Sequence, residues 1–254
     1  MNAYTSFAQV YDMFMDNIPY DEWCKYLVEI LKKYGIEDGL VLELGCGTGS
    51  VTRRLEKSKY NMIGIDSSED MLSIAREQGP DSILYLLQDM TEFELYGTVN
   101  AVVSICDSIN YILEEDDLLK VFKLVNNYLE KDGIFVFDLN TIYKYSEIMG
   151  DNVIAENREE GSFIWENTYY EDEQINEYNL TLFIKDEEDN KYNRYEEIHY
   201  QRAYSIDTVK EILKKSGMEF VAVYDAFTWN KPSEQSERVY FVAKEGHQNN
   251  KKYV

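Results

Sequence analysis

The stretch VLELGCGTGS, residues 41–50, decides the fold. A short apolar run leads into three glycines at alternate positions, Gly45, Gly47 and Gly49. A glycine turn lets the backbone approach a ligand closely, because no Cβ atom stands in the way. The stretch therefore predicts a buried β-strand, a turn that binds a ligand, and the start of a helix.

The ligand of this turn need not be a phosphate. The dinucleotide-binding pattern GxGxxG would require a third glycine where Ser50 stands, and the stretch lacks the lysine of a phosphate-binding loop. Glu43 stands just before the turn, where a carboxylate would repel a pyrophosphate and suit a cation. Asp66 ends the next apolar run, and an acid at that place can accept hydrogen bonds from both hydroxyls of a ribose.

Apolar runs and amphipathic stripes alternate over the first 140 residues. Strands are predicted at 40–44, 61–66, 83–87, 100–106 and 133–139. Helices are predicted at 21–34, from the glycine turn to about Leu55, from Ser67 or Ser68 with Ser68 as a cap, and at 115–129. Strands that are apolar on both faces and separated by helices form a parallel sheet covered on both sides, and right-handed crossovers make it doubly wound. The sequence thus predicts an α/β fold.

The pattern changes after Asn140. Three segments alternate as half-buried strands do and predict an antiparallel β meander inserted into the α/β domain: 162–170, 177–185 and 195–204. A helix at 207–216 and strands at 219–225 and 237–244 are expected to return to the main sheet. The predicted boundaries are 1–140 and 206–245 for the main domain, 141–205 for the insert and 246–254 for a flexible tail.

Composition argues against several kinds of partner and site. The 254 residues carry 25 Lys and Arg against 48 Asp and Glu, a formal charge of −23 that repels nucleic-acid phosphates. The amino terminus has no basic segment before an apolar one, and no apolar run reaches membrane-spanning length. Three scattered cysteines form no CxxC pair and the two histidines are far apart, so no disulfide framework or metal site is expected. We therefore expect a cytoplasmic protein without nucleic-acid, membrane or metal partners.

Four motifs occur in the order ELGCGTG, GIDSSEDML, LLQDM and VVSICDSINYI. Together they resemble the sequential motifs of class I S-adenosylmethionine-dependent methyltransferases, over roughly residues 1 to 140 and again in the last strands. The resemblance implies a mostly parallel, seven-stranded, Rossmann-like sheet and S-adenosyl-L-methionine as the cofactor. The glycine turn would then approach the methionine and ribose portion of a sulfonium compound.

The resemblance also implies a role for individual residues. Glu43 would lie near the methionine ammonium group or organise the turn, and Asp66 would hold the ribose hydroxyls, unless it only caps the next helix. Asp89 would accept a hydrogen bond from the adenine amino group. Met71 fits the hydrophobic core as well as it fits an adenine contact. The remaining cofactor contacts are expected at Gly45, Cys46, Gly47, Ser67, Met90 and Cys106.

The segment YTSFAQVYDMFMDNIPYDEW, residues 4–23, and the meander resemble a bacterial group of small-molecule methyltransferases. That group includes sugar N,N-dimethyltransferases and the Firmicute proteins related to YqeM, to which the sequence is most similar. The resemblance implies that residues 1–20 form a lid over the cofactor and that the insert borders the substrate pocket. Tyr4 is expected on the substrate side and Tyr11 against the cofactor, although Tyr11 also belongs to an apolar helix stripe that could pack without a ligand.

Methyl transfer from a sulfonium is an in-line displacement, so the enzyme mainly aligns the reactants and excludes water. A general base is needed only where the acceptor arrives protonated. The candidates after the fourth strand are Asp107 and Tyr111, with Asn110 on the substrate side. A histidine takes the place of Tyr111 in the resembling sugar enzymes, and a tyrosine with a pKa of about 10 is a poor base. Packing at a helix edge for Tyr111 and loop capping for Asp107 are the alternatives.

The sequence therefore predicts methyl transfer to a small-molecule acceptor, an amine or a hydroxyl, by a monomer or a homodimer. The negative charge favours cationic or neutral acceptors over phosphorylated ones. Two alternatives stay open at this stage. A protein-modifying methyltransferase would use the insert as a docking surface, and a regulator would bind the cofactor without catalysis.

Overall fold

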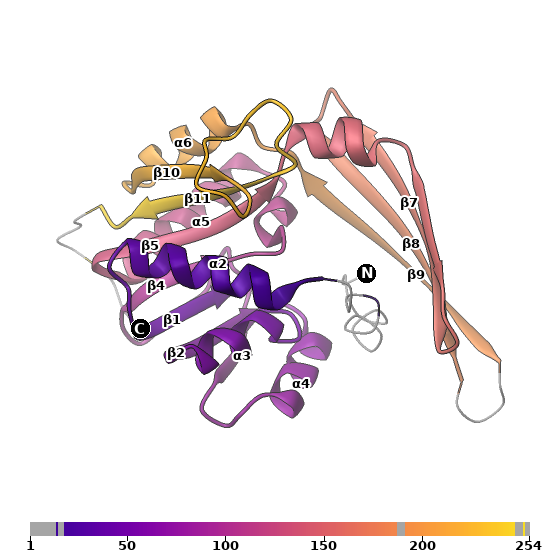
Figure 1. Ribbon diagram of the computed structural model, residues 1–254, viewed down its shortest axis with the longest axis horizontal. Helices are drawn as coiled ribbons and strands as arrows, with labels where there is room; N and C mark the ends of the chain where they lie inside the picture. The colour runs from indigo at the N-terminus through magenta and orange to yellow at the C-terminus, as the bar shows by residue number, and fades with distance from the viewer. Residues whose placement is uncertain (1–13, 15–17, 187–190, 247–250, 252–254) are drawn as a thin grey trace.

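The computed structural model describes Phe14, residues 18–186 and 191–246, and Lys251. These residues form a seven-stranded sheet and a separate four-stranded sheet. Figure 1 shows the smaller sheet standing to one side of the main domain, on the side toward which the parallel strands run. The arrangement places the insert where ligands of parallel sheets bind.

The seven-stranded sheet has the strand order β10-β11-β5-β4-β1-β2-β3. Strands β1 to β5 pair in parallel, and β11 is antiparallel to both β5 and β10. The prediction of a mostly parallel seven-stranded α/β sheet is thereby confirmed. Its strands are β1 (Gly39–Leu44), β2 (Tyr60–Asp66), β3 (Leu84–Leu87), β4 (Val99–Ser104), β5 (Leu129–Asn140), β10 (Glu219–Asp225) and β11 (Arg238–Lys244).

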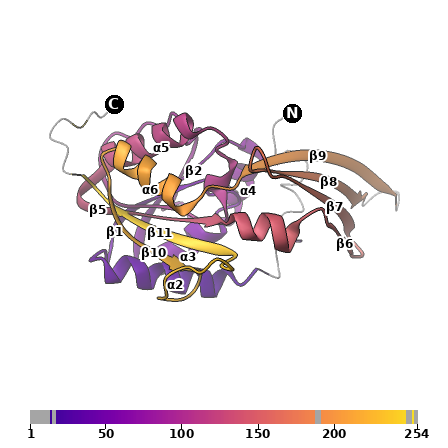
Figure 2. The ribbon, with the colours of Figure 1, turned by 90° about the horizontal axis from the view of Figure 1, so that it is seen from above.

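Helices cover both faces of this sheet. Figure 2 shows α5 and α6 on one side of the strands, and α2 and α3 on the other. The helix α4 packs on the same face as α2 and α3, because its Leu72 and Ala75 belong to the cluster beneath them. The helices are α2 (Tyr20–Lys33), α3 (Ser50–Lys57), α4 (Glu69–Gln78), α5 (Glu115–Tyr128) and α6 (Ile206–Lys215).

The core consists of two hydrophobic clusters, one on each face of the sheet. Val102 of β4 belongs to the cluster under α5 and α6, whereas its neighbours Ala101 and Val103 belong to the cluster under α2 and α3. Successive side chains of a strand point to opposite faces, so a strand covered on both faces must be apolar throughout. Val102 and Val103 are fully buried, and each such burial contributes about 1.5–3 kcal/mol.

The insert is a four-stranded antiparallel meander preceded by a π-helical turn, η2 (Lys144–Met149). Its strands are β6 (Val153–Asn157), β7 (Gly161–Tyr170), β8 (Ile175–Lys185) and β9 (Tyr192–Arg202). The three strands predicted from alternation correspond to β7, β8 and β9. Strand β6 was not predicted, because it is short and four of its five side chains are exposed. On β8, Tyr178, Leu180 and Leu182 are buried while the residues between them are half-buried, as a one-sided sheet requires.

The observed bounds differ from the predicted ones at several ends; β5, for example, begins at Leu129 and not at residue 133, and β9 ends at Arg202 and not at residue 204. Strand β4 ends at Ser104, two residues before the predicted end, because Cys106 and Asp107 adopt φ values of 63° and 54° that no strand can continue. Of the predicted flexible tail, Gly246 and Lys251 are described, and the Lys251 ammonium lies 3.1 Å from the buried carboxylate of Glu245. The boundaries of the insert as a separate domain stay a prediction.

Candidate active site

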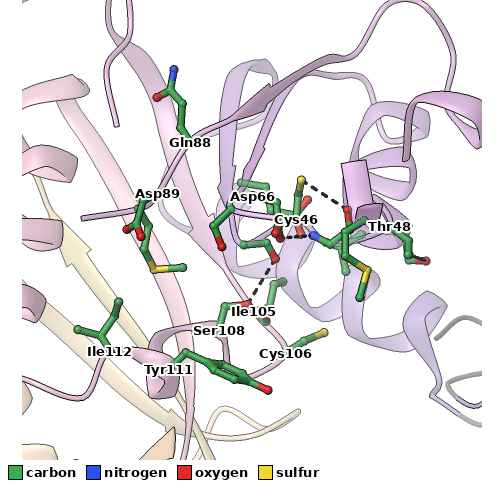
Figure 3. Close-up of a pocket in the computed structure, with 18 of the residues that line it drawn as sticks. Cys46, Thr48, Asp66, Gln88, Asp89, Ile105, Cys106, Ser108, Tyr111 and Ile112 are labelled. Carbon is green, nitrogen blue, oxygen red and sulfur yellow. Dashed lines mark hydrogen bonds between the residues drawn. The ribbon is translucent and has the colours of Figure 1, made fainter. Parts of the chain in front are cut away.

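A cavity of about 420 Å³ opens at the carboxyl ends of the parallel strands, where open α/β sheets bind their ligands. It is lined from the turns that follow β1, β2, β3 and β4. Figure 3 shows Cys106, Ser108 and Tyr111 together on one side of it and Cys46 and Asp66 on the other. The structure brings these predicted residues to the cavity: Glu43, Gly45, Cys46, Gly47, Asp66, Ser67, Met71, Asp89, Met90, Cys106 and Tyr111.

The glycine turn leaves open space beside its backbone. Gly45 and Gly47 have φ values of 69° and 53°, in the left-handed region that side chains disfavour. A Cβ atom on Gly45 would lie 2.7 Å from the Ser108 hydroxyl oxygen, whereas one on Gly47 would meet nothing within 4 Å. The position beside Gly47 is therefore a cradle that any side chain would fill, and it is available to a ligand.

Asp66 connects this turn to the next helix. Its Oδ2 accepts the N–H of Gly47 at 2.8 Å, and its Oδ1 accepts the N–H of Ser68 at 2.9 Å. Ser68 is the cap of α4, as predicted, because its hydroxyl oxygen accepts the N–H of Met71. Burial raises the pKa of Asp66, and the two backbone hydrogen bonds oppose that rise. Asp66 thus orients the turn while it faces the cavity; its contact with a ribose stays a prediction.

Glu43 is an acid held in an almost fully buried position at the base of the cavity. Its side chain accepts a hydrogen bond from the Thr52 hydroxyl on α3. Burial raises the pKa of Glu43 to about 8, and the negative charge of Asp66 adds to the effect, while the Thr52 bond opposes it. A cation in the cavity would favour the ionised form, so the protonation of Glu43 is linked to what the cavity holds.

Asp89 follows β3 and lines the same cavity as Glu43. Its Oδ1 accepts the backbone N–H and the hydroxyl proton of Thr91, both at 2.7 Å. These bonds fix the turn around Asp89 without using Oδ2, which leaves an acceptor for a ligand amino group. The predicted contact with adenine is compatible with this geometry and stays a prediction.

The cysteine thiols at the cavity lack nucleophilic character. Burial raises the pKa of both Cys46 and Cys106 well above the usual range, so both stay protonated, and only the thiolate is reactive. Cys46 packs tightly under the second strand, because a Cβ atom on Gly64 would lie 2.9 Å from its sulfur. The interpretation of Cys46 as a small residue in a tight turn fits these contacts.

The wall nearest the insert is η1 (Ser108–Tyr111), a short 3₁₀-helical turn. The Tyr111 hydroxyl oxygen lies 3.3 Å from Nδ1 of His199 on β9, and Nε2 of His199 lies 3.1 Å from Oε2 of Glu197. Neither His199 nor Glu197 was predicted as a site residue. The available signal was their spacing, because residues i and i+2 of a strand share one face.

Two predicted residues do not line the cavity. The carboxylate of Asp107 is held by Arg238 at 2.6 Å and by Nε2 of Gln201 at 2.7 Å, so the structure uses it as an internal tie. Asn110 is fully buried, and its amide bonds the backbone of Asn140 and Arg202. Asn110 therefore joins β5 to β9, and the expectation of a substrate contact there is corrected.

The expected lid falls mostly on residues that are not described. Tyr4 and Tyr11 lie outside the described residues. Of the segment 1–20, Tyr20 lines the cavity, and Phe14 packs edge-on against Phe163 of β7 with ring centroids 5.0 Å apart. Sequence reasoning also missed several lining residues next to predicted ones: Tyr20, Thr48, Ser50, Val51, Gln88, Ile105, Ser108 and Ile112.

The charged groups that line the cavity have one sign. Among the described residues that line it, the ionisable carboxyl groups are those of Glu43, Asp66 and Asp89, and none of these lining residues is basic. The part of the chain covered by the structure holds no cluster of three metal-ligating residues, and no helix there is long and apolar enough to cross a bilayer. The cavity suits a ligand with a cationic group and hydroxyl or amino donors.

Comparison with known proteins assigns the family. A family profile described as a methyltransferase domain matches residues 41–133. YqeM of Bacillus subtilis (strain 168), named as a methyltransferase, is 37% identical over 243 residues, which cover 94% of this chain and 96% of that protein. The chain belongs to the methyltransferases. The resemblance of this methyltransferase to the YqeM-like proteins is thereby confirmed.

The cofactor follows from a solved structure. A crystal structure of an S-adenosylmethionine-dependent methyltransferase from Clostridium acetobutylicum ATCC 824 matches with a TM-score of 0.83 and 30% identity, covering 96% of this chain and 100% of that one. The methyltransferase is thus an enzyme that depends on S-adenosylmethionine. A more distant relative is the dTDP-3-amino-3,4,6-trideoxy-alpha-D-glucopyranose N,N-dimethyltransferase of Streptomyces venezuelae, 29% identical over 133 residues, 52% of this chain and 56% of that protein.

The residues of the methyltransferase cavity fit this cofactor chemically. The cofactor carries an ammonium group, a positive sulfonium and two ribose hydroxyls, and the cavity offers carboxylates at Glu43, Asp66 and Asp89. The cradle beside Gly47 gives such a ligand access to the backbone. The buried side chain of Met71 also lines the cavity and supplies apolar surface there.

Proposed function

We propose that this methyltransferase transfers a methyl group to the nitrogen of a small-molecule amine. The observation that carries the proposal is the acidic lining of the cavity, because the described lining residues include the acids Glu43, Asp66 and Asp89 and no basic side chain. Such a cavity attracts an ammonium compound and repels a phosphorylated one. The name of the Streptomyces venezuelae relative, an N,N-dimethyltransferase of an amino sugar, supports an amine acceptor over a hydroxyl.

In this proposal each acid of the cavity binds a different part of the cofactor, and Tyr111 lies on the side of the acceptor. When bound, S-adenosylmethionine supplies a methyl group on a sulfonium sulfur that leaves with the electron pair of the carbon–sulfur bond. Glu43 would attract the ammonium group of the cofactor, Asp66 would accept from the ribose hydroxyls, and Asp89 would accept from the adenine amino group. Tyr111 stands on the opposite wall, next to the insert, where the acceptor would enter.

The insert and the segment 1–20 would cover the cavity in this proposal. A displacement has to exclude water, and closing elements commonly do so. Strand β9 supports the idea, because its Gln201 and Arg202 contact Asp107 and Asn110 directly after β4. Tyr20, at the end of the proposed lid, lines the cavity. Residues 141–205 would then choose the acceptor while the main domain holds the cofactor.

A protein acceptor is the second candidate, and one observation favours it. The outer face of the insert exposes large apolar side chains, among them Ile164 and Ile198. Exposed apolar groups of this kind can mark a docking surface. A docked protein would have to reach the same cavity with a flexible side chain, so the two candidates differ in the acceptor and share the cofactor site.

The test is transfer of labelled methyl from S-adenosylmethionine into a cell extract separated into small molecules and proteins. The proposal expects label in a cationic small molecule, which mass spectrometry then identifies. Asp66→Ala is the matched control, because it should lose cofactor binding and therefore all label. Label confined to the protein fraction would favour the second candidate, and a labelled hydroxyl or no label would overturn the proposal.

We further propose that the enzyme acts in the cytoplasm as a monomer or a homodimer. Cys24, Cys46 and Cys106 are unbridged, which suits a reducing compartment. The excess of acidic residues disfavours nucleic acid as a partner. Light scattering coupled to gel filtration measures the mass of the particle, and fractionation of cells locates it.

A further inference from the structure

Three side chains from two distant parts of the chain form a continuous hydrogen-bonded row at the cavity. The Tyr111 hydroxyl lies 3.3 Å from Nδ1 of His199, although 88 residues separate them, and Nε2 of His199 lies 3.1 Å from the carboxylate of Glu197. The two rings meet edge to face, with centroids 6.0 Å apart. Only Tyr111 lines the cavity, so the row leads from the cavity wall into the insert.

The hydrogen-bonding partners determine the direction of this row. With Glu197 ionised, its carboxylate only accepts, and Nε2 of His199 would then carry the hydrogen that it donates to Glu197. In a neutral imidazole the other nitrogen, Nδ1, is then an acceptor. In that tautomer the Tyr111 hydroxyl would donate its proton to Nδ1 of His199.

The row is built into the inner face of the insert. His199 and Glu197 share one face of β9, opposite Tyr178 and Leu180 of β8, and their side chains are only 4% and 7% exposed. Ile198 and Tyr200, between and beside them, point to the exposed face. Burying an acid and a base costs solvation free energy even when the two are paired, and packing alone does not explain why this pair is buried there.

We propose that Tyr111, His199 and Glu197 relay a proton away from an acceptor amine that arrives as an ammonium ion. The inference rests on the proposed function. The ammonium gives one proton to the Tyr111 oxygen as Tyr111 passes its own hydroxyl proton to Nδ1 of His199. The amine keeps its lone pair for the new carbon–nitrogen bond, and the imidazolium is stabilised by the Glu197 carboxylate until the proton returns to water.

The relay removes the objection to tyrosine as a base. Tyr111 never has to hold a full negative charge, because it gains one proton as it loses another, and the charge appears on His199 next to Glu197. In this assignment Tyr111 is the catalytic residue that touches the acceptor. His199 and Glu197 are positioning residues that act through it.

The groups around the relay do not compete for the proton. Tyr178 of β8 lies opposite His199 in the strand register, and the hydroxyl groups of Tyr145, on η2, and Tyr178 both donate to the side-chain oxygen of Gln201. Burial raises the pKa of both tyrosines well above the usual range, so both stay neutral. The carboxylate of Asp107 acts on them from the turn after β4 and is compensated by Arg238. The carboxyl group of Glu197 lies in direct contact with the imidazole, at 3.1 Å from Nε2.

The first test needs no acceptor. The chain has two histidines, so His247→Gln leaves His199 as the sole source of imidazole signals in long-range ¹H–¹⁵N spectra. With S-adenosylhomocysteine added, the proposal expects the Nε2–H tautomer and a shift of the Nδ1 resonance in Tyr111→Phe. Tyr200→Phe, on the opposite face of β9, is the matched control and should not move it. An Nδ1–H tautomer, or a resonance indifferent to Tyr111, would overturn the relay.

The second test follows rate against pH in the labelled-methyl assay, with the small-molecule fraction of the extract as acceptor. At pH 7, Tyr111→Phe and His199→Asn should each lower the rate by a factor of about 100 or more, as loss of general-base catalysis does. Affinity for S-adenosylhomocysteine should be unchanged. The loss should shrink as the pH rises toward about 10, because a larger fraction of the amine then arrives unprotonated. The double variant should lose no more than the worse single variant.

The outcomes separate the relay from the proposed function. A loss of equal size at every pH, or additive losses in the double variant, would mean that the side chains only support the fold, and the relay would fall. Absence of label with the wild-type enzyme would overturn the proposed function and not the geometry, which the tautomer of His199 decides independently.

Discussion

The guanidinium of Arg238 lies 2.6 Å from the carboxylate of Asp107, although 131 residues separate the two in the chain. The same guanidinium pairs with Asp138, which is fully buried. Asp138 also accepts the backbone N–H groups of Cys106, at 3.2 Å, and of Asp107, at 2.8 Å. Two left-handed residues in a row are thus held by one buried acid and its cation, and the cavity wall follows directly after them.

Replacing Arg238 by methionine should therefore lower the free energy of unfolding by about 3–5 kcal/mol, because it leaves a buried carboxylate without its cation. Urea denaturation measures the change. Arg76→Met is the matched control, since the ion pair of Arg76 with Glu69 is exposed and should be worth at most about 1 kcal/mol. Equal losses in the two variants would contradict the role given to Arg238.

The buried acid Glu43 should make stability depend on pH. Its pKa is raised from 4.5 to about 8, so the folded protein binds a proton that the unfolded chain releases above pH 4.5. Stability contributed by Glu43 is therefore lost as pH rises from about 4.5 to about 8. We expect Glu43→Gln to flatten this slope and to raise the melting temperature at pH 8. A wild-type slope kept in Glu43→Gln would show that other groups cause it.

The same acid should release a proton when the cofactor binds. At pH 7 Glu43 is mostly protonated in the protein alone, and the ammonium group of the ligand favours its carboxylate. Titration calorimetry in two buffers of different ionisation enthalpy measures the protons exchanged on binding S-adenosylhomocysteine. Wild type should release more protons than Glu43→Gln; identical values would mean that the ammonium group lies away from Glu43.

Asp66→Ala should weaken cofactor binding more than Asp89→Ala. Asp66 would lose two charge-assisted bonds to the ribose and Asp89 one to the adenine, each worth about 1.5–3 kcal/mol. Asp66→Ala also removes the acceptor of the Gly47 N–H, which loosens the turn. Calorimetry compares the affinities, with Asp70→Ala, an exposed acid on α4, as control. An unchanged affinity in Asp66→Ala would leave that carboxylate only its part in the turn.

Gln201→Leu should lower the free energy of unfolding, because Gln201 joins the insert to the turn after β4. The Gln201 amide donates to Asp107 and accepts the hydroxyl protons of Tyr145 and Tyr178, at 2.7 and 2.6 Å. Leucine would leave these buried partners unsatisfied, at about 1–3 kcal/mol for each polar group. The expected loss in urea denaturation is larger than that of Tyr200→Phe, on the exposed face of the same strand. A loss no larger than that of Tyr200→Phe would contradict the role of Gln201.

Sequence patterns predicted the parts of the fold that depend on periodicity. The apolar runs and glycine turn located the parallel strands and most of the cavity, because burial on both faces and a positive φ leave direct marks on residue type. The end of β4 was placed too late, since Cys106 and Asp107 are held in left-handed conformations by Asp138, a contact across strands. Asn110 likewise reads as a polar loop residue until β5 and β9 converge on it.

His199 was missed for a related reason. A histidine far from the motifs carries no local signal, and its approach to Tyr111 depends on how the insert folds back over the turn after β4. Contacts between the insert and the main domain depend on tertiary packing, and the residue pattern of each segment on its own does not contain that information.

Asn110 has a consequence for how such enzymes diversify. Its single side-chain amide bonds the carbonyl of Asn140, where the chain leaves the main sheet, and that of Arg202, just before the chain returns to it. One side chain of the main domain thus bonds both ends of the insert. Recombination between related genes could therefore exchange the segment between Asn140 and Arg202 while the residues that line the cofactor cavity in the main domain stay in place. Since we propose that residues 141–205 choose the acceptor, we expect that exchanging the segment between Asn140 and Arg202 would change the acceptor and leave the cofactor site intact.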